Sequence, residues 1–168
     1  MGIVNVTPDS FSDGGRFVDI ETAVFHGVRL VDEGAAILDV GGESTRPTAE
    51  PVAADVEKAR VLPVVAALAA GVATPISIDT YKASVAAAAI DSGASIVNDV
   101  WGFQRDPDMA RVVAANGAVA VLMHNRAAVD PDLDIVADML AFLSRSIDIA
   151  LAAGVAEDRK STRLNSSH

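Results

Sequence analysis

Five short apolar runs alternate along the chain with longer segments whose apolar residues recur at helical spacing. This alternation predicts a parallel sheet with right-handed crossovers, either doubly wound or closed into a barrel. A composition that is 51% hydrophobic and only 21% charged agrees with parallel strands buried between helices. The predicted strands are residues 3–6, 36–40, 75–78, 95–97 and 119–123.

The segments after these strands predict helices with recognisable limits. Asp19 is an expected N-cap, and Pro63 is expected to kink the second helix or to mark a restart. Four of the helices should end at glycines, which commonly close helices. The predicted helices begin at Ile20, about Val52, Lys82, Asp106, and Asp132 or Asp134, and they end before Gly34, at about Ala70, at Ser92 before Gly93, at Gly117 and at Gly154.

Polar residues stand at or near the end of every predicted strand, and this favours the barrel. In a barrel such positions converge at the C-terminal mouth, where active sites are built. The Gly-x-Gly-x-x-Gly turn of dinucleotide-binding sheets is also absent after the first strand. The 168 residues are fewer than the roughly 250 of a typical eight-fold barrel, so only part of one is expected. The polar residues are Asn5, Asp39, Asp79, Asn98 and His124.

Two of these residues have the chemistry to recognise a heterocycle. The Asp79 carboxylate can accept from ring N–H and amino groups, and the Asn98 amide can both donate and accept. Capping of the following helices is the competing interpretation, especially for Asp79. His124 is more readily explained as a structural residue than as a base or a ligand.

The polar loops after the first two strands suggest a lid and an anion site. Residues 7–15 contain two aspartates and paired glycines, which suits a mobile lid as well as an ordinary surface loop. Arg46 and Thr45 could bind phosphate or carboxylate, although a solvated surface arginine is the simpler interpretation. Asn5 could offer its side-chain oxygen to Mg²⁺.

Charge and composition exclude several classes of partner. The formal net charge of -10 argues against nucleic acid and anionic membrane surfaces. The chain has no cysteine, no visible secretory leader and no apolar run long enough to span a membrane. We therefore expect a cytoplasmic protein that acts on small molecules.

Several blocks of the sequence together resemble dihydropteroate synthase of the pterin-binding barrel family. The two longest and most specific are residues 5–15 and 39–47, and shorter ones lie at 78–80, 97–99 and 122–124. The resemblance covers residues 1–159, which are expected to form the N-terminal part of a pterin-binding domain. It implies an α/β fold, a partial TIM (β/α)8 barrel with about five βα units of eight.

The resemblance implies a transferase of folate biosynthesis and a set of site residues. The enzyme would condense 4-aminobenzoate with 6-hydroxymethyl-7,8-dihydropterin diphosphate, giving 7,8-dihydropteroate and diphosphate. By resemblance, Asn5 would hold Mg²⁺ and Asp13 would order the first loop near the reacting carbon. The substrate contacts would come from Thr45 and Arg46 on the diphosphate, Asp79 and Asn98 on the pterin, and Phe11 and Pro47 around aminobenzoate, a pocket that sulfonamides also occupy.

The chain also departs from the family pattern. Residues 160–168 match nothing in the family and are expected to be a disordered or artefactual tail, and the chain looks truncated at both ends. It is therefore expected to be inactive or unstable by itself, whereas the complete family enzyme would be a homodimer. A methyltetrahydrofolate-binding methyltransferase module and a non-catalytic fragment are the alternatives.

Overall fold

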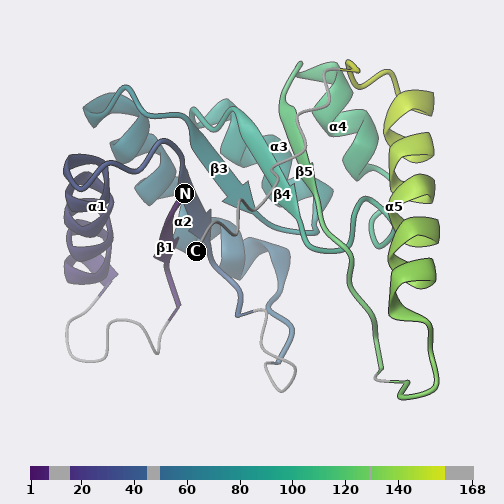
Figure 1. Cartoon of the computed structure of the whole chain (residues 1–168). Coiled ribbons are helices and arrows are strands. Elements are labelled where there is room, and N and C mark those ends of the chain that lie inside the picture. Colours follow the sequence, from purple (N-terminus) through teal and green to yellow (C-terminus); the bar gives the residue numbers. More distant parts are fainter. Residues whose placement is uncertain (8–15, 45–49, 129, 158–168) are drawn as a thin grey trace.

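The computed structural model describes residues 1–7, 16–44, 50–128 and 130–157, which form one parallel sheet flanked by helices (Figure 1). The strands pair in the order β1-β2-β3-β4-β5, and every pairing is parallel. Their bounds are β1 Gly2–Asn5, β2 Leu38–Gly41, β3 Ile76–Asp79, β4 Ile96–Asp99 and β5 Val119–Leu122.

One helix follows each strand, and each helix packs against the next one along the chain. Glycines with φ between 59 and 112° follow α1, α3, α4 and α5, so the four predicted glycine stops are confirmed. None of the helices in the described ranges is long and apolar enough to cross a membrane. The bounds are α1 Arg16–Asp32, α2 Ala54–Gly71, α3 Ala83–Asp91, α4 Met109–Ala115 and α5 Ile135–Ala152.

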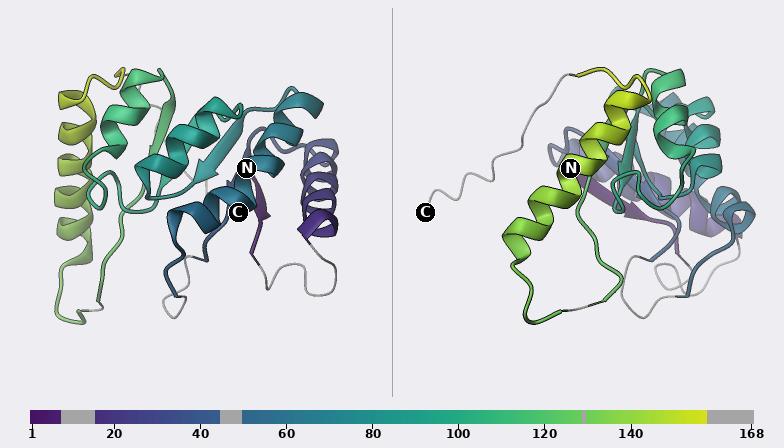
Figure 2. Two further views of the ribbon diagram at one scale, coloured as in Figure 1. Left: turned by 180° about the vertical axis from the view of Figure 1, so that it is seen from behind. Right: turned by 90° about the vertical axis from the view of Figure 1, so that its right-hand side faces the viewer.

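The strand order decides between the two predicted architectures. A doubly wound sheet reverses its strand order and has helices on both faces. Here the order follows the sequence without a reversal, and right-handed crossovers then place all helices on one side, as Figure 2 shows from behind and from the side. The prediction of a partial barrel with five βα units is confirmed.

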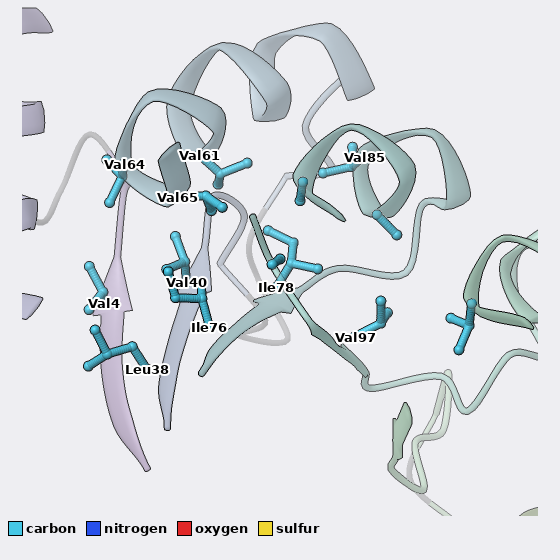
Figure 3. Packing of buried hydrophobic residues seen from close by; sticks show 14 of the residues in the cluster. Val4, Leu38, Val40, Val61, Val64, Val65, Ile76, Ile78, Val85 and Val97 are labelled. Atoms are coloured by element: carbon cyan, nitrogen blue, oxygen red, sulfur yellow. The ribbon is translucent and has the colours of Figure 1, made fainter. Parts of the chain in front are cut away.

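The core lies between the sheet and its helices. Val4, Val40, Ile78 and Val97 stand side by side on neighbouring strands and are completely buried. Figure 3 shows them directed toward the valines of α2 and α3. Burial of a valine of this kind contributes roughly 1.5–3 kcal/mol, so this layer is the main anchor of the strands.

The opposite face of the sheet is polar at the C-terminal ends of its strands. Since side chains alternate along a strand, the residues next to the buried valines point away from the helices. In the register of the sheet, Asn5, Gly41, Asp79 and Asn98 form one row across β1 to β4. The concave face therefore carries chemistry at the C-terminal ends of four neighbouring strands.

Three helix details differ from the sequence prediction. Helix α1 begins at Arg16, so the N-cap predicted at Asp19 was wrong. Pro63 lies inside one continuous α2 rather than marking a restart. The N-cap of α4 is Asp108 rather than Asp106, but Asp106 still accepts the Asp108 N–H at 3.0 Å through Oδ1, directly before the helix. The other Asp106 oxygen, Oδ2, accepts the backbone N–H of Ala83 at 2.8 Å and so also supports the start of α3.

Candidate active site

A buried polar pair lies on the concave face of the sheet. The Asn98 side-chain N–H donates to Asp39 Oδ2 at 3.1 Å, and the two residues are only 7% and 6% exposed. Among the described residues, Asp39 Oδ1 and Asn98 Oδ1 have no partner. Buried acceptors are rarely left unpaired, so this pair is suited to a ligand that brings N–H donors.

Asp79 ends β3 beside Asn98 and has a strongly altered acidity. Burial, followed by the nearby carboxylates of Asp39, Glu57, Asp99 and Glu43, raises the pKa of Asp79 to about 7. The carboxyl group therefore changes charge near neutral pH. A cationic or donor-rich ligand would favour the ionised form.

Capping does not explain these two residues. The N–H of Lys82, the N-cap residue of α3, is bound by the Thr80 hydroxyl at 3.2 Å rather than by Asp79. The Asn98 amide reaches Asp39 on the concave face instead of the following helix. The predicted ligand-facing positions of Asp79 and Asn98 are compatible with both observations.

Asn5 ends β1 on the same row and is exposed. Between it and Asp79 stands Gly41, where an added Cβ would lie 3.6 Å from Asp79 Oδ2 and 3.7 Å from Asn5 Oδ1. The glycine thus leaves open the space that separates two oxygen donors. An exposed amide oxygen fits Mg²⁺, which uses few protein ligands, although the described ranges contain no group of three His, Cys, Asp or Glu residues that would hold a metal alone.

A pocket of about 260 Å³ opens beside this row, lined by residues from the segments that follow β2, β3, β4 and β5. Asp79 and Glu57 belong to its lining, together with Tyr81, Trp101 and Arg105. The pocket therefore lies at the C-terminal ends of the strands, where the polar strand ends predict the active site.

Three residues of the pocket wall, Glu43, Glu57 and Tyr81, form an ionic network with Lys82, which we call the Glu43 cluster. Lys82 Nζ pairs with Glu43 Oε2 and with Glu57 Oε2, and the Tyr81 hydroxyl donates to Glu43 Oε1 at 2.8 Å. Burial works to raise the pKa of Glu43, but the hydrogen bonds from Lys82 and Tyr81 bring it below its usual value. Burial likewise opposes the charge of Lys82, and the two carboxylates still raise the pKa of its ammonium.

An arginine between two aromatic rings forms another part of the lining. The Arg105 guanidinium lies 4.2 Å from the centre of the Tyr81 ring and 4.9 Å from that of Trp101. Trp101 is placed by Asp99, whose carboxylate accepts the N–H of Trp101 at 2.8 Å and that of Phe103 at 3.0 Å. Phe103 has φ 65°, a left-handed conformation that is unusual for a bulky residue, and the Asp99 bond helps to hold it.

His124 has a structural explanation. Its Nε2 lies 2.7 Å from Asp138 Oδ2 on α5, and its ring meets Phe142 edge-on at 5.1 Å. Arg126 Nη1 pairs with the same Asp138 oxygen at 3.0 Å. These contacts fasten α5 to the end of β5, which agrees with the interpretation favoured from the sequence.

The structure brings together three of the predicted site residues, Asn5, Asp79 and Asn98, on one row of the concave face. The other five lie outside the described residues, namely Phe11, Asp13, Thr45, Arg46 and Pro47. The tail predicted at 160–168 lies there as well.

Sequence reasoning left out several residues of the site. Asp39 was noted as a polar strand residue but was not assigned to a ligand, although its place among apolar residues was a usable signal. Glu57 and Lys82 gave no such signal, because charged residues on or beside helices are ordinarily solvent-facing.

Comparison with known proteins agrees with this arrangement. The model of the family described as "Pterin binding enzyme" matches residues 1–159. The chain is 52% identical over 157 residues to the dihydropteroate synthase of Bacillus subtilis, covering 94% of this chain and 55% of that protein.

Two solved structures show the same fold. The dihydropteroate synthase of Clostridium difficile, determined with pteroic acid, superposes with a TM-score of 0.89 at 47% identity, covering 94% of this chain and 60% of that one. The enzyme from Xanthomonas albilineans with 4-aminobenzoic acid gives 0.87 at 47% identity, covering 93% and 57%. The chain thus spans little more than half the length of these relatives, and it belongs to the family of pterin binding enzymes.

Proposed function

We propose that this chain forms the pterin-binding part of a dihydropteroate synthase, a transferase of folate biosynthesis. The observation that carries the proposal is the set of acceptors on the concave face: Asp39, Asp79 and Asn98, with two buried oxygens unpartnered among the described residues. A dihydropterin ring presents amino and ring N–H groups, which match these acceptors. Relatives named dihydropteroate synthase support this proposal over the methyltransferase and non-catalytic alternatives.

The substrates follow from the same comparison. The Clostridium difficile structure was determined in the presence of pteroic acid and the Xanthomonas albilineans structure with 4-aminobenzoic acid. For this chain we infer 6-hydroxymethyl-7,8-dihydropterin diphosphate and 4-aminobenzoate as substrates, with 7,8-dihydropteroate and diphosphate as products. Asp79 and Asn98 hold the pterin.

The reaction is a substitution at the pterin methylene carbon. The bond from that carbon to the diphosphate oxygen breaks, the aniline nitrogen of 4-aminobenzoate forms the new C–N bond, and its proton leaves to solvent. Positive charge develops on the pterin as diphosphate departs. The ionised Asp79 carboxylate stabilises that charge, and such preorganised electrostatics is the main requirement for this chemistry.

Asn5 is proposed to hold Mg²⁺ together with the diphosphate oxygens and water. The exposed amide oxygen of Asn5 and the open space above Gly41 fit such an ion. When bound, Mg²⁺ would neutralise charge on the departing diphosphate.

The remaining proposed contacts come from residues outside the described ranges. Thr45 and Arg46 would bind the diphosphate side, Phe11 and Pro47 would shape the aminobenzoate pocket, and Asp13 would order the first loop. Arg46 is suited to this role because its planar guanidinium matches phosphate geometry.

The test uses a synthase chimera, in which residues 1–157 of this chain continue into the corresponding C-terminal part of the Bacillus subtilis enzyme. We expect dihydropteroate to form from the two substrates with Mg²⁺. A chimera that unfolds cooperatively but yields no product, while the Bacillus subtilis enzyme is active in parallel, would overturn the proposal.

A further inference from the structure

A hydrogen bond between Asp39 and Asn98 crosses the concave face of the sheet. Asp39 lies on β2 and Asn98 on β4, so the bond passes over β3. The β3 residue in register with Asp39 is Ser77, which is completely buried and small enough for the two longer side chains to meet above it. The Asn98 side-chain N–H donates to Asp39 Oδ2 at 3.1 Å, and both residues are almost completely buried. The contact therefore links two strands that are not neighbours in the sheet.

The chemistry of Asp39 determines which way the Asn98 amide is turned. A carboxylate only accepts hydrogen bonds, whereas an amide has a donating nitrogen and an accepting oxygen. With its oxygen toward Asp39, Asn98 would place two acceptors against each other in a buried site, which costs free energy. The structure has the nitrogen toward Asp39, and Asn98 Oδ1 is buried without a partner among the described residues. Asp39 therefore fixes the amide oxygen as the atom that Asn98 offers to a ligand.

We propose that Asp39 is a positioning residue for the pterin, acting through Asn98: by holding the amide nitrogen, it directs the amide oxygen toward an N–H group of the ring. The inference rests on the proposed function, which assigns Asn98 to the pterin. The site then selects an N–H donor at this position, because a buried acceptor that is left unpaired is costly. Holding the amide in advance also reduces the entropy that binding must cost.

Exchanging the two side chains tests this role. In the synthase chimera, Asp39→Asn leaves two amides whose orientations are no longer fixed, and Asn98→Asp places two carboxylates against each other. We expect each single change to raise the Kd of 6-hydroxymethylpterin about tenfold in titration calorimetry. The double variant Asp39→Asn/Asn98→Asp has an amide at position 39 that donates to a carboxylate at position 98, whose second oxygen faces the ligand. Its Kd should return to within about threefold of the parent value.

Stability measurements separate positioning from a merely structural role. Asp39→Asn removes a buried negative charge that acts on Asp79, so its melting temperature should not fall although binding weakens. The matched control is Asp55→Asn, the same change in an exposed aspartate paired with Lys58, which should leave both values unchanged. A double variant that binds as weakly as the single ones would overturn the proposal. So would a fall in melting temperature that parallels the loss of binding in Asp39→Asn.

Hydrogen exchange of the Asn98 side chain provides a test that needs no ligand. Its amide protons, observed by NMR, should exchange at least about tenfold faster in Asp39→Ala than in the parent chimera, because their acceptor is lost. Unchanged exchange would overturn the role of Asp39, even in a chimera that binds the pterin. A parent chimera that folds but does not bind 6-hydroxymethylpterin would instead refute the proposed function.

Discussion

Two ionic clusters lie near the strand ends of this sheet, and they differ in burial and in the segments that they join. In the Glu43 cluster, the side chains of Lys82, Glu43 and Glu57 are 16%, 12% and 1% exposed. In the cluster after β5, His124, Asp138 and Arg126 are 13%, 26% and 31% exposed. The first joins three segments beside the proposed site, whereas the second fastens one helix to one strand.

Similar ion pairs therefore contribute differently to the stability of the fold, according to how much solvent reaches them. Removing one partner of a buried pair leaves an uncompensated charge, which is costly, while exposed pairs contribute little. The Glu43 cluster, which contains the completely buried Glu57, should therefore be more sensitive to substitution than the less buried cluster of His124 and Asp138.

Breaking the buried cluster should have the largest effect. Lys82→Met leaves Glu43 and Glu57 facing each other, and we expect a loss of about 3–5 kcal/mol in the free energy of unfolding. Urea denaturation followed by circular dichroism would measure it. The control Lys82→Arg keeps the cation and should lose less than half as much; equal losses would show that charge is not the cause.

Asp79 tests the combined influence of burial and of the nearby carboxylates, first Asp39 and then Glu57 of the Glu43 cluster. Its pKa lies near 7 when folded and near its ordinary 3.8 when unfolded, so the folded state retains a proton between these values. Raising the pH from about 4 to 7 therefore destabilises the fold. We expect Asp79→Asn to stabilise the chain by roughly 2–4 kcal/mol at pH 8 and to have little effect at pH 4.

The same Asp79→Asn variant should lose activity while it gains stability. In the synthase chimera we expect turnover to fall at least about a hundredfold, because the charge that stabilises the developing cation is lost. Melting temperatures at pH 4 and 8, with turnover measured at pH 8, would check both halves. A near-normal rate would refute the role of Asp79.

The adjacent residues Gly41 and Gly42 have different surroundings. Gly42 is packed against α2, whereas Gly41 faces the space proposed for the ligand. A Cβ at Gly42 would lie 2.7 Å from Val61 Cγ1, so Gly42→Ala should cost about 1–3 kcal/mol in stability. A Cβ at Gly41 makes only ordinary contacts, and Gly41→Ala should change stability by less than about 0.5 kcal/mol. Thermal melting would separate them, and Gly41→Ala should nevertheless raise KM for the pterin diphosphate.

The cluster of His124, Asp138 and Arg126, which is the less buried of the two, should give the smallest effect. The hydrogen bond from His124, ahead of that from Arg126, lowers the pKa of Asp138, so its contribution to stability is present above its ordinary value of 3.8 and is lost as the pH falls through the lower folded value. Asp138→Asn should lower the melting temperature at pH 7 less than Lys82→Met does. At pH 3 the difference between variant and parent should have decreased; a difference independent of pH would point to packing instead.

Much of the fold was predictable because local signals and tertiary packing agree. The glycines after α1, α3, α4 and α5 mark real helix ends, and Asp134 caps α5 by accepting from Val136 and Ala137. Where tertiary contacts contribute, local reasoning was incomplete. Asp106 precedes a proline and was predicted to cap the fourth helix; one of its oxygens does bind the Asp108 N–H before α4, but the cap position is Asp108 and the other oxygen binds the start of α3.

The site was predictable to the extent that it lies at strand ends. Asn5, Asp79 and Asn98 are visible there as polar residues after apolar runs, and register alone brings them together. Glu57 and Lys82 could not be found in this way, because their meeting depends on how α2 and the segment before α3 approach one another. A single sequence contains no local sign of that approach.

The sequential strand order has a consequence for how the protein is made. Each strand pairs with the one synthesised just before it, and each helix packs on its predecessor. A nascent chain leaving the ribosome would therefore meet its docking partner already present, without waiting for a distant segment. Assembly can proceed as elongation does, one strand and one helix at a time, from the amino terminus onward.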